Sequence, residues 1–539
     1  MTTTTTMPPA PRALAPAVPR TAPPAPAELD LPGTLDCTLL TALAAADRPR
    51  VRLDAGADAD LTRSREGLER ILAAGLPVYG STTGFGPHVR YAAGDDPFAQ
   101  GSGLIAHLAS GAGALAEPGV VRAMMIVRAA SLARGRSAIR PGTLRAYLRL
   151  LESGLVPAVP ELGSVGASGD LVPLAHAARL LTGEGLALAD EPHAHLLGRT
   201  RPALEALAAV GTAPVPLDAR DALSLVNGTS YSTAIAALAV VRARRLVTRA
   251  AQLTGWLYAA LGARQQALDP RLHHVRGQSG QVRAAALVRD QLAASRAGAG
   301  AGDGSGEHDG RPLQEVYSLR CAAQVLGPAL ELVEVAAGMV DDELAGVTDN
   351  PLIVEEPAGP QGWTALHGGN FHAAAVATAA DLLTGALTQV TVLAERLVDV
   401  LASPPTSRAP LLLASRPGAQ AGIAGAQLTA SAVLAEARHA CAWASTMSVP
   451  TNAGNQDIVP MAPLAARTAL AQTDRLATVL GVLVVALSQY QHLVARGLAD
   501  GFAAAPPSWL PPMPGFDDDV ETRSLIAAAA RHLLAEEPE

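Results

Sequence analysis

The stretch GSVGASGDLVPLAH, residues 163–176, joins a turn with three glycines to the start of an apolar helical run. Glycine leaves the backbone free of side-chain crowding, so main-chain atoms can approach one another closely. Two kinds of chemistry fit this stretch. In one, the free N–H groups of the turn hold an anion at the start of a helix. In the other, the amide nitrogen of Gly169 attacks the carbonyl carbon of Ala167, and loss of water from the Ser168 side chain leaves an exocyclic methylene. The tripeptide alone favours the plain turn, because a short motif is a hypothesis until its context supports it.

The composition favours a helical protein. The chain has 539 residues, enough for about two to four domain-sized units. Charged residues make up 17% and aromatic residues 3%, and the abundance of alanine and leucine favours helix over strand. We expect a mainly α fold, an elongated helical bundle with a smaller N-terminal domain that carries the Ala-Ser-Gly loop.

Charge and cysteine content argue against several classes of partner. A net charge of -8 gives no electrostatic basis for binding nucleic acid. Cys37, Cys321 and Cys441 are far apart and form no CxxC pair, so they indicate neither a disulfide framework nor a zinc site. We therefore expect a protein of the reducing cytoplasm with no metal.

The sequence contains no lysine, and every basic side chain apart from histidine is arginine. A pyridoxal-phosphate (PLP) Schiff base needs a lysine amine, and a Walker A loop needs its lysine as well. Both are excluded. An enzyme that acts on amino acids and is made from this chain needs another electrophile.

Composition and periodicity divide the chain into four parts. The first, rich in Thr, Pro and Ala, has little to bury and no continuous apolar stretch of the kind found in signal peptides, so we expect a disordered tail. The others are an N-terminal domain with the loop, a central bundle of long helices and a C-terminal segment. Their bounds are 1–28, 29–215, 216–496 and 497–539.

Apolar residues at helical spacing predict individual helices. In the central part, leucine and valine recur every three or four residues between 383 and 401, as expected of a helix buried along one stripe. The helices predicted this way are 61–72, 120–133, 141–153, 216–262, 370–402, 419–447 and 462–496, and a weaker pattern begins at 100.

Two stretches have alternative interpretations. Residues 476–495 contain no Asp, Glu, Lys or Arg and are long enough to span a membrane. Polar side chains crowd the second half, so we expect a helix in the middle of a soluble bundle or oligomer. Residues 297–310 have the composition of a flexible linker and are either a mobile loop near a site or a tolerated surface insertion.

Eight motifs occur in order across almost the whole folded part. Taken singly, residues such as Tyr79 and His107 are more often packing or structural groups. Together the motifs closely resemble the aromatic amino acid ammonia-lyase and aminomutase family, which includes the histidine, phenylalanine and tyrosine ammonia-lyases. They are VYGSTTGFG at 78, HLASG at 107, GSVGASGDLVPLAH at 163, LVNGTS at 225, YSLRC at 317, TDNPL at 348, HGGNFHA at 367 and GNQDIVPM at 454.

The resemblance implies an electrophile made by the chain itself. In that family the Ala-Ser-Gly triad cyclises to 4-methylidene-imidazol-5-one (MIO), which here would form from Ala167, Ser168 and Gly169. Elimination of ammonia needs both activation of a poor leaving group and a base that removes a weakly acidic β-hydrogen. An electrophile of this kind supplies the first, and the absence of lysine is consistent with it.

The resemblance also assigns roles around that group. Tyr79 matches the catalytic base, Tyr317 the second tyrosine, and Arg320 the arginine that pairs with the substrate carboxylate. Because an unperturbed tyrosine titrates at about 10, we expect the site to lower the pKa of Tyr79. The remaining matches are Asn227 and Gln278, which would hydrogen-bond the imidazolone or the carboxylate, Asn350 and Phe371, which would line the site, and Gln456 opposite the amino group.

The pair His107-Leu108 indicates the substrate. In the family this pair faces the substrate ring, and His-Leu is typical of the tyrosine lyases, since an imidazole can hydrogen-bond a phenol. Histidine lyases carry a glutamate where this chain has Gln456. We therefore expect conversion of L-tyrosine to trans-p-coumarate. Open alternatives are a tyrosine 2,3-aminomutase giving β-tyrosine, a phenylalanine or histidine ammonia-lyase, and a non-enzymatic anion-binding or scaffold protein.

Two further expectations come from the resemblance. The family forms homotetramers in which each active site takes residues from three subunits, with the apolar helices at the centre. One departure concerns the loop of Tyr79, where Ser81, Thr82 and Thr83 precede Gly-Phe-Gly although many members have an asparagine there. It leaves the hydrogen bonding around Tyr79 open.

Overall fold

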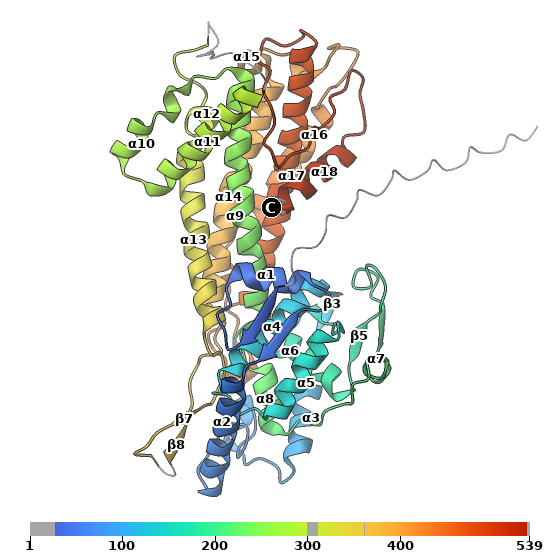
Figure 1. Ribbon diagram of the computed structural model, residues 1–539, viewed down its shortest axis with the longest axis vertical. Coiled ribbons are helices and arrows are strands. Elements are labelled where there is room, and N and C mark those ends of the chain that lie inside the picture. Colours follow the sequence, from blue (N-terminus) through green and yellow to red (C-terminus); the bar gives the residue numbers. More distant parts are fainter. Residues whose placement is uncertain (1–26, 299–310, 360–361, 536–539) are drawn as a thin grey trace, which may run out of the picture.

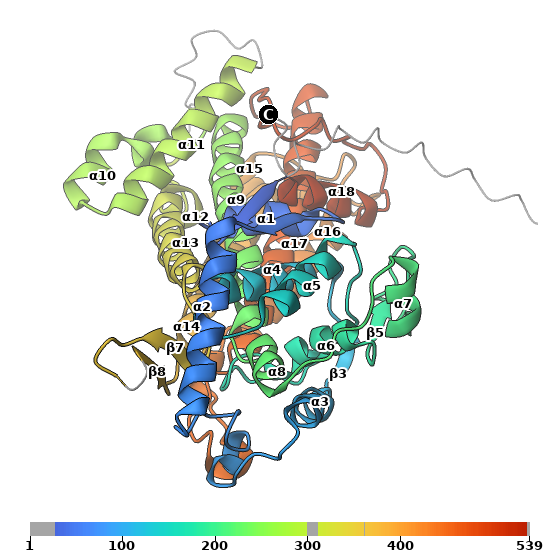
Figure 2. The same ribbon diagram turned by 60° about the horizontal axis from the view of Figure 1, so that its bottom comes forward.

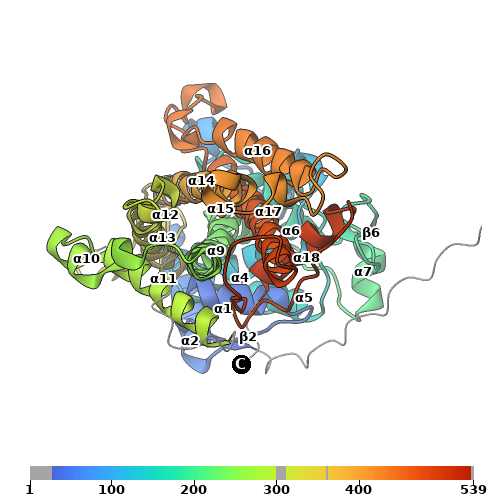
Figure 3. The same cartoon turned by 90° about the horizontal axis from the view of Figure 1, so that it is seen from above.

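Long helices form the body of the molecule in this computed structural model, which describes residues 27–298, 311–359 and 362–535. They run side by side along the longest axis and appear nearly end-on in Figure 3. Their bounds confirm the helices predicted at 370–402 and 462–496, whereas the helix predicted at 216–262 is broken at 227–229 into two helices. The long helices are α9 (Ser230–Leu261), α11 (Ser279–Gly298), α13 (Ala322–Ala345), α14 (Ala374–Ala402) and α17 (Ala462–Ala495).

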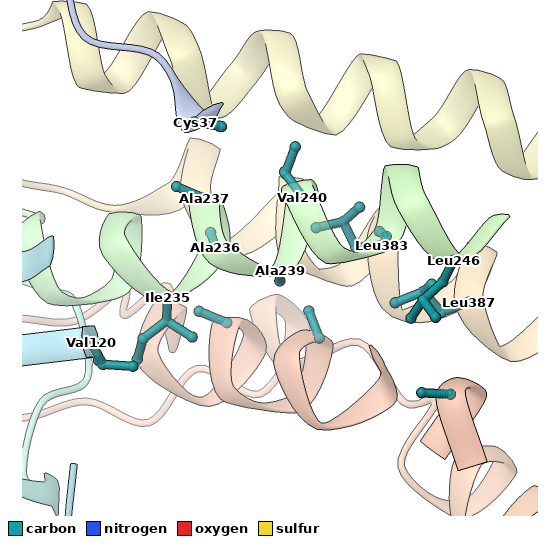
Figure 4. Close-up of a cluster of buried hydrophobic side chains, with 14 of the residues drawn as sticks. Cys37, Val120, Ile235, Ala236, Ala237, Ala239, Val240, Leu246, Leu383 and Leu387 are labelled. Atoms are coloured by element: carbon teal, nitrogen blue, oxygen red, sulfur yellow. The ribbon is translucent and has the colours of Figure 1, made fainter. Parts of the chain in front are cut away.

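Helix α9 lies at the centre of this bundle and contacts the other long helices. Its alanines allow close approach, and Val240 and Leu246 lie beside Leu383 and Leu387 of α14, while Ile235 lies apart from these leucines (Figure 4). All five side chains are almost fully buried. The mainly α, elongated bundle predicted from composition is confirmed.

The N-terminal part packs across one end of the bundle (Figure 1). Its first strand pairs in parallel with the second, and Glu28 already belongs to it, while residues 1–26 of the predicted tail lie outside the described residues. The elements are β1 (Glu28–Leu31), α1 (Cys37–Ala45), β2 (Arg50–Leu53), α2 (Ala55–Ala73), α3 (Pro97–Leu108), β3 (Ala112–Leu115), α4 (Pro118–Ala133), α5 (Pro141–Glu152), β4 (Pro160–Leu162), α6 (Leu171–Thr182), β5 (Leu186–Leu188), β6 (Thr200–Pro202), α7 (Ala203–Ala209) and α8 (Ala219–Val226).

Shorter elements complete the fold. A hairpin of β7 (Leu352–Glu355) and β8 (Trp363–Leu366) packs its Trp363 against Gly67 of α2, where a Cβ would lie 2.4 Å from the indole ring. Residues 299–310, most of the linker-like stretch, lie outside the described residues. The other elements are η1 (Gly86–Arg90), η2 (Gln265–Leu268), α10 (Pro270–Arg276), α12 (Tyr317–Arg320), α15 (Pro404–Ser407), η4 (Leu411–Leu413), α16 (Ala424–His439), η5 (Ala444–Thr446), η6 (Asn452–Gly454) and α18 (Arg523–Leu534).

Four helical stretches of the described chain are long and apolar enough, by length and composition alone, to cross a membrane. At least half of the most apolar part of each stretch is buried inside the molecule, and the lowest buried share is 50%, in α13. Apolar side chains of these helices therefore serve helix packing. The stretches are Ala219–Leu261, Ala322–Ala345, Ala374–Ala402 and Ala462–Ala495.

A buried ionic cluster joins the N-terminal part to the segment between α13 and β7. Asp349 is fully buried, and its Oδ2 lies 2.9 Å from Arg220 Nη2 and 3.6 Å from Arg128 Nη2. Arg220 also donates to the carbonyl of Pro351, and Arg128 to that of Ser224. Burial lowers the pKa of both arginines, while the charge of Asp349 opposes that shift. The cluster fixes the backbone on both sides of Asn350.

Candidate active site

The Ala167-Ser168-Gly169 turn lies between β4 and α6 in a strained backbone. Gly166 has φ +73° and Gly169 has φ +70°, values that disfavour any residue with a Cβ. A Cβ on Gly169 would lie 2.3 Å from the carbonyl oxygen of Gly228. Only glycine fits at 169, as cyclisation onto Ala167 also requires.

Asp170 ties this turn to the start of α9. Its fully buried carboxylate accepts hydrogen bonds from Ser164 Oγ and from the backbone N–H and Oγ of Ser232, each at 2.8 Å. Its own N–H donates to the carbonyl of Gly228 at 2.7 Å. Burial raises the pKa of Asp170, and the serine donors oppose that shift. Sequence reasoning missed this residue, although an acidic residue directly after a glycine turn is a visible signal.

Side chains from distant segments hold Ser168. Its Oγ accepts from Gln456 Nε2 at 2.6 Å, and its carbonyl accepts from Asn227 Nδ2 at 3.2 Å. The Oδ1 of Asn227 is buried without a hydrogen-bond partner among the described residues. Asn227, expected to bond the imidazolone or the carboxylate, and Gln456, expected opposite the amino group, therefore both contact Ser168. Their contacts leave an unsatisfied acceptor beside it.

Two N–H groups of the turn already have hydrogen-bond acceptors within the protein, so these two do not face an anion. The N–H of Gly166 donates to Ser164 Oγ, and that of Asp170 to Gly228. The carbonyls of Val165 and Gly166 accept from Met461 and Ala373, the residues that precede α17 and α14. The turn is thus anchored by segments that enter the long helices.

Tyr79 lies in the loop after α2 and is held at both ends. Its hydroxyl oxygen accepts from the N–H of Gly86 at 2.7 Å, the first N–H of η1, and its own backbone N–H donates to His367 Nε2 at 3.1 Å. The ring also packs edge-on against Phe85. The hydroxyls of Thr82 and Thr83 accept from the N–H groups of Val78 and Gly80, so threonines stabilise this loop where many family members have an asparagine.

The expected lowering of the Tyr79 pKa is wrong for the single chain. Burial of the phenol raises the pKa of Tyr79, and the Gly86 N–H opposes that shift only in part. The phenol lies at the positive end of η1, but this helix is short and loss of water outweighs its one donor.

A cavity of about 460 Å³ opens beside Tyr79. Asn350 lines it, and its Oδ1 accepts from the N–H of Gly368 at 2.8 Å. The structure therefore brings Tyr79 and Asn350 to one cavity of a size that suits an amino acid. Its lining is Pro77, Tyr79, Thr83, Val89, Asn350, His367 and Gly368.

The lining of this cavity does not include the candidates His107, Leu108 and Phe371. His107 and Leu108 end α3, where the exposed His107 ring uses Nδ1 to bond the carbonyl of Gly103 at 3.0 Å. Because the carbonyl accepts, Nδ1 carries the proton and Nε2 of a neutral ring is an acceptor. Phe371 is half-buried between β8 and α14, two residues before the Ala373 that bonds the turn.

Gln278, Tyr317 and Arg320 lie at the other end of the molecule. They belong to the region of α10 and α12, far along the bundle from α6 and α8 in both Figure 1 and Figure 2. Tyr317 is 71% exposed, and the Arg320 guanidinium stacks on its ring at 4.6 Å. The candidate residues of one chain therefore form two separate groups, which we call the triad half-site, around Ser168, and the arginine half-site, around Arg320.

Fold and site together define a carbon–nitrogen lyase, and comparison with known proteins agrees. Residues 35–505 match the family described as aromatic amino acid lyase, and the chain belongs to that family. The recognition of the family from its ordered motifs is confirmed, which sets aside the non-enzymatic interpretation. Lyases and aminomutases both occur among its relatives.

Three individual proteins show how similar the chain is to known lyases and aminomutases. The tyrosine ammonia-lyase of Cupriavidus metallidurans is 37% identical over 445 residues, 80% of this chain and 81% of that protein. Tyrosine aminomutase from Streptomyces globisporus is similar in structure, with TM-score 0.82, 31% identity and coverage of 94% of this chain and 97% of that chain. Histidine ammonia-lyase from Trypanosoma cruzi has TM-score 0.80, 28% identity and coverage of 94% and 93%.

The close approach at Gly169 predicts a large loss of stability on adding one methyl group. Gly169→Ala should lower the free energy of unfolding by about 3 kcal/mol or more, since backbone strain and overpacking each cost about 1–3 kcal/mol. Gly142→Ala in α5, where nothing lies within 4 Å of the added Cβ, is the matched control. Urea denaturation at one protein concentration compares the two, and equal midpoints would contradict the packing described for the turn.

Proposed function

We propose that the protein eliminates ammonia from L-tyrosine to give trans-p-coumarate, with an MIO group formed from Ala167, Ser168 and Gly169. The observation that carries the proposal is the Ser168 position. Gln456 and Asn227 hold the serine from both sides, while Gly169 is pressed against Gly228. In the cyclisation, the Gly169 nitrogen bonds to the Ala167 carbonyl carbon, and two waters leave, one from that carbonyl and one from the Ser168 side chain.

Residues of this chain supply the rest of the reaction. The MIO group, once formed, supplies an electrophilic methylidene that turns the substrate amine into a leaving group. Arg320 binds the substrate carboxylate through its planar guanidinium, whose buried Nε has no partner among the described residues. Tyr79 removes the β-proton as a phenolate, held in place by the Gly86 N–H. Because burial raises the pKa of Tyr79, the reaction is favoured by alkaline pH.

The proposed assembly is a homotetramer that brings the triad half-site of one chain to the arginine half-site of another. The segments of both contain exposed apolar side chains, with Val275 and Leu313 near Gln278 and Tyr317 in the sequence and Trp443 and Ile458 on either side of Gln456. Exposed apolar side chains of this kind are common at protein interfaces. The free cysteines also fit the proposed cytoplasmic location.

An aminomutase that returns the amine to the β-carbon is the second candidate. The structural likeness to a tyrosine aminomutase at 31% identity favours it. Both reactions need the same electrophile and base, so the outcome depends on whether the acrylate leaves before ammonia returns.

Product analysis decides between the two and tests the reaction class. Wild-type protein incubated with L-tyrosine at alkaline pH should release ammonia and p-coumarate in equal amounts, measured by chromatography. Ser168→Ala should release neither, and its intact mass should lack the loss of two waters that wild type shows. Accumulation of β-tyrosine would instead establish the aminomutase, and full activity of Ser168→Ala would refute the MIO group.

The half-sites predict complementation between inactive subunits. Ser168→Ala and Arg320→Met should each be inactive alone, but co-expressed and purified through two tags they should recover about a quarter of the wild-type sites for random assembly. Ser168→Ala co-expressed with Gln456→Ala is the control, because Gln456 contacts Ser168 within one chain and no intact site can form. If the first pair recovers no more activity than the control, the site is not shared between chains.

The His107 ring predicts selectivity for tyrosine. If its Nε2 accepts the substrate phenol, His107→Phe leaves a buried hydroxyl unpaired and should cost about 1–3 kcal/mol in kcat/KM for tyrosine. The value for phenylalanine should rise or stay unchanged. Measurement of kcat/KM for both substrates in both proteins gives the ratio. An unchanged ratio, or a wild type that prefers histidine, would show that His107 does not select the substrate.

A further inference from the structure

The geometry points to His367 as a positioning residue that holds the catalytic loop of Tyr79 through a hydrogen bond to its backbone. The inference rests on the proposed role of Tyr79 as the base. His367 Nε2 accepts from the Tyr79 N–H at 3.1 Å, and both residues line the cavity beside Asn350. The resemblance to the family assigns no role to this histidine.

The segment that carries His367 is itself anchored. It follows β8, which pairs with β7 through four residue pairs and packs Trp363 against α2. The next residue, Gly368, donates to Asn350 Oδ1, and Asn350 follows the Asp349 that two buried arginines hold. His367 thus connects the loop of Tyr79, which lies at the cavity, to the segment fixed by the buried ionic cluster of Asp349.

The contact requires one protonation state of the ring. A peptide N–H can only donate, so Nε2 of His367 must be unprotonated and Nδ1 carries the proton. Arg220 of α8 is the charged group that acts on the ring, and the Tyr79 phenol is the titratable group on the loop it bonds. Partial burial and Arg220 both lower the pKa of His367 below its usual value, which favours the neutral ring.

Tyr79 is therefore clamped twice, at its backbone by His367 and at its phenol oxygen by Gly86. The hydrogen bond from Gly86 orients the phenol oxygen, and the hydrogen bond to His367 fixes the position of the loop backbone. A displacement of about 1 Å in a catalytic group can cost about 100-fold in rate. Loss of the backbone clamp should accordingly reduce kcat more than it weakens substrate binding.

Two substitutions at His367 and one control test the proposal. His367→Leu, which cannot accept, should lower kcat by about 10- to 100-fold with KM changed little. His367→Gln, whose Oε1 can take the place of Nε2, should restore kcat to within a few-fold of wild type. His88→Gln in η1 changes a neighbouring histidine that makes no side-chain hydrogen bond among those described, and should leave kcat unchanged.

The pH dependence provides a readout that a merely structural role would not change. Below the lowered pKa of His367, protonation of Nε2 removes the acceptor, so the acid side of the wild-type kcat profile should steepen from one proton to two. His367→Gln should keep a single-proton slope over the same range. An unchanged steepening in His367→Gln, or wild-type kcat in His367→Leu, would overturn the proposal.

Hydrogen exchange separates this inference from the proposed function. The Tyr79 amide, followed by mass spectrometry of peptides covering 77–86, should exchange faster in His367→Leu than in wild type or His367→Gln. A wild type that releases no ammonia would refute the function alone, because the exchange result still tests the contact. Equal exchange in all three proteins would refute the contact.

Discussion

The close approach of Gly169 to Gly228 is the contact on which the rest of the site depends. It places the reactive turn against the start of α9, and Gly228 in turn leaves room for the Arg128 guanidinium, which a Cβ would meet at 2.0 Å. Arg128 donates to the Thr348 carbonyl and lies beside Asp349, so the segment that carries Asn350 is fixed from the same point. From Asn350 the contacts continue through Gly368 and His367 to Tyr79. One connected set of contacts therefore links the Ala167-Ser168-Gly169 turn to Tyr79.

The use of buried charge in this set is costly in free energy. Moving an arginine or a carboxylate out of water costs several kcal/mol, and apolar residues of similar volume often stabilise a fold as well or better. The ionic cluster instead fixes the position of one backbone segment through directional hydrogen bonds. The arginines bond particular carbonyls on both sides of Asn350 as well as Asp349, whereas an apolar core would leave the register of that segment free to shift.

The sequence predicted those parts of the fold and site that are local. The helical spacing of apolar residues was sufficient to predict α14 and α17. The ordered motifs were sufficient to identify the family. They did not indicate α13 separately, where Pro328 lies inside the helix in spite of its missing N–H. Nor did they show the contacts of Asp170 and His367 or the raised pKa of Tyr79, because each depends on burial or on partners far away in the chain. The domain boundaries and the roles carried over from the family stay predictions.

The separation of the two half-sites along the bundle bears on when the protein can act. Under the proposed assembly, a newly synthesised chain has the turn at one end and Arg320 at the other, so by itself it would hold no complete site. Association of copies as proposed would then act as a switch with a concentration threshold, set by the dissociation constant of the assembly rather than by affinity for the amino acid. At low expression such an enzyme would be silent, and its output would rise more steeply than its amount.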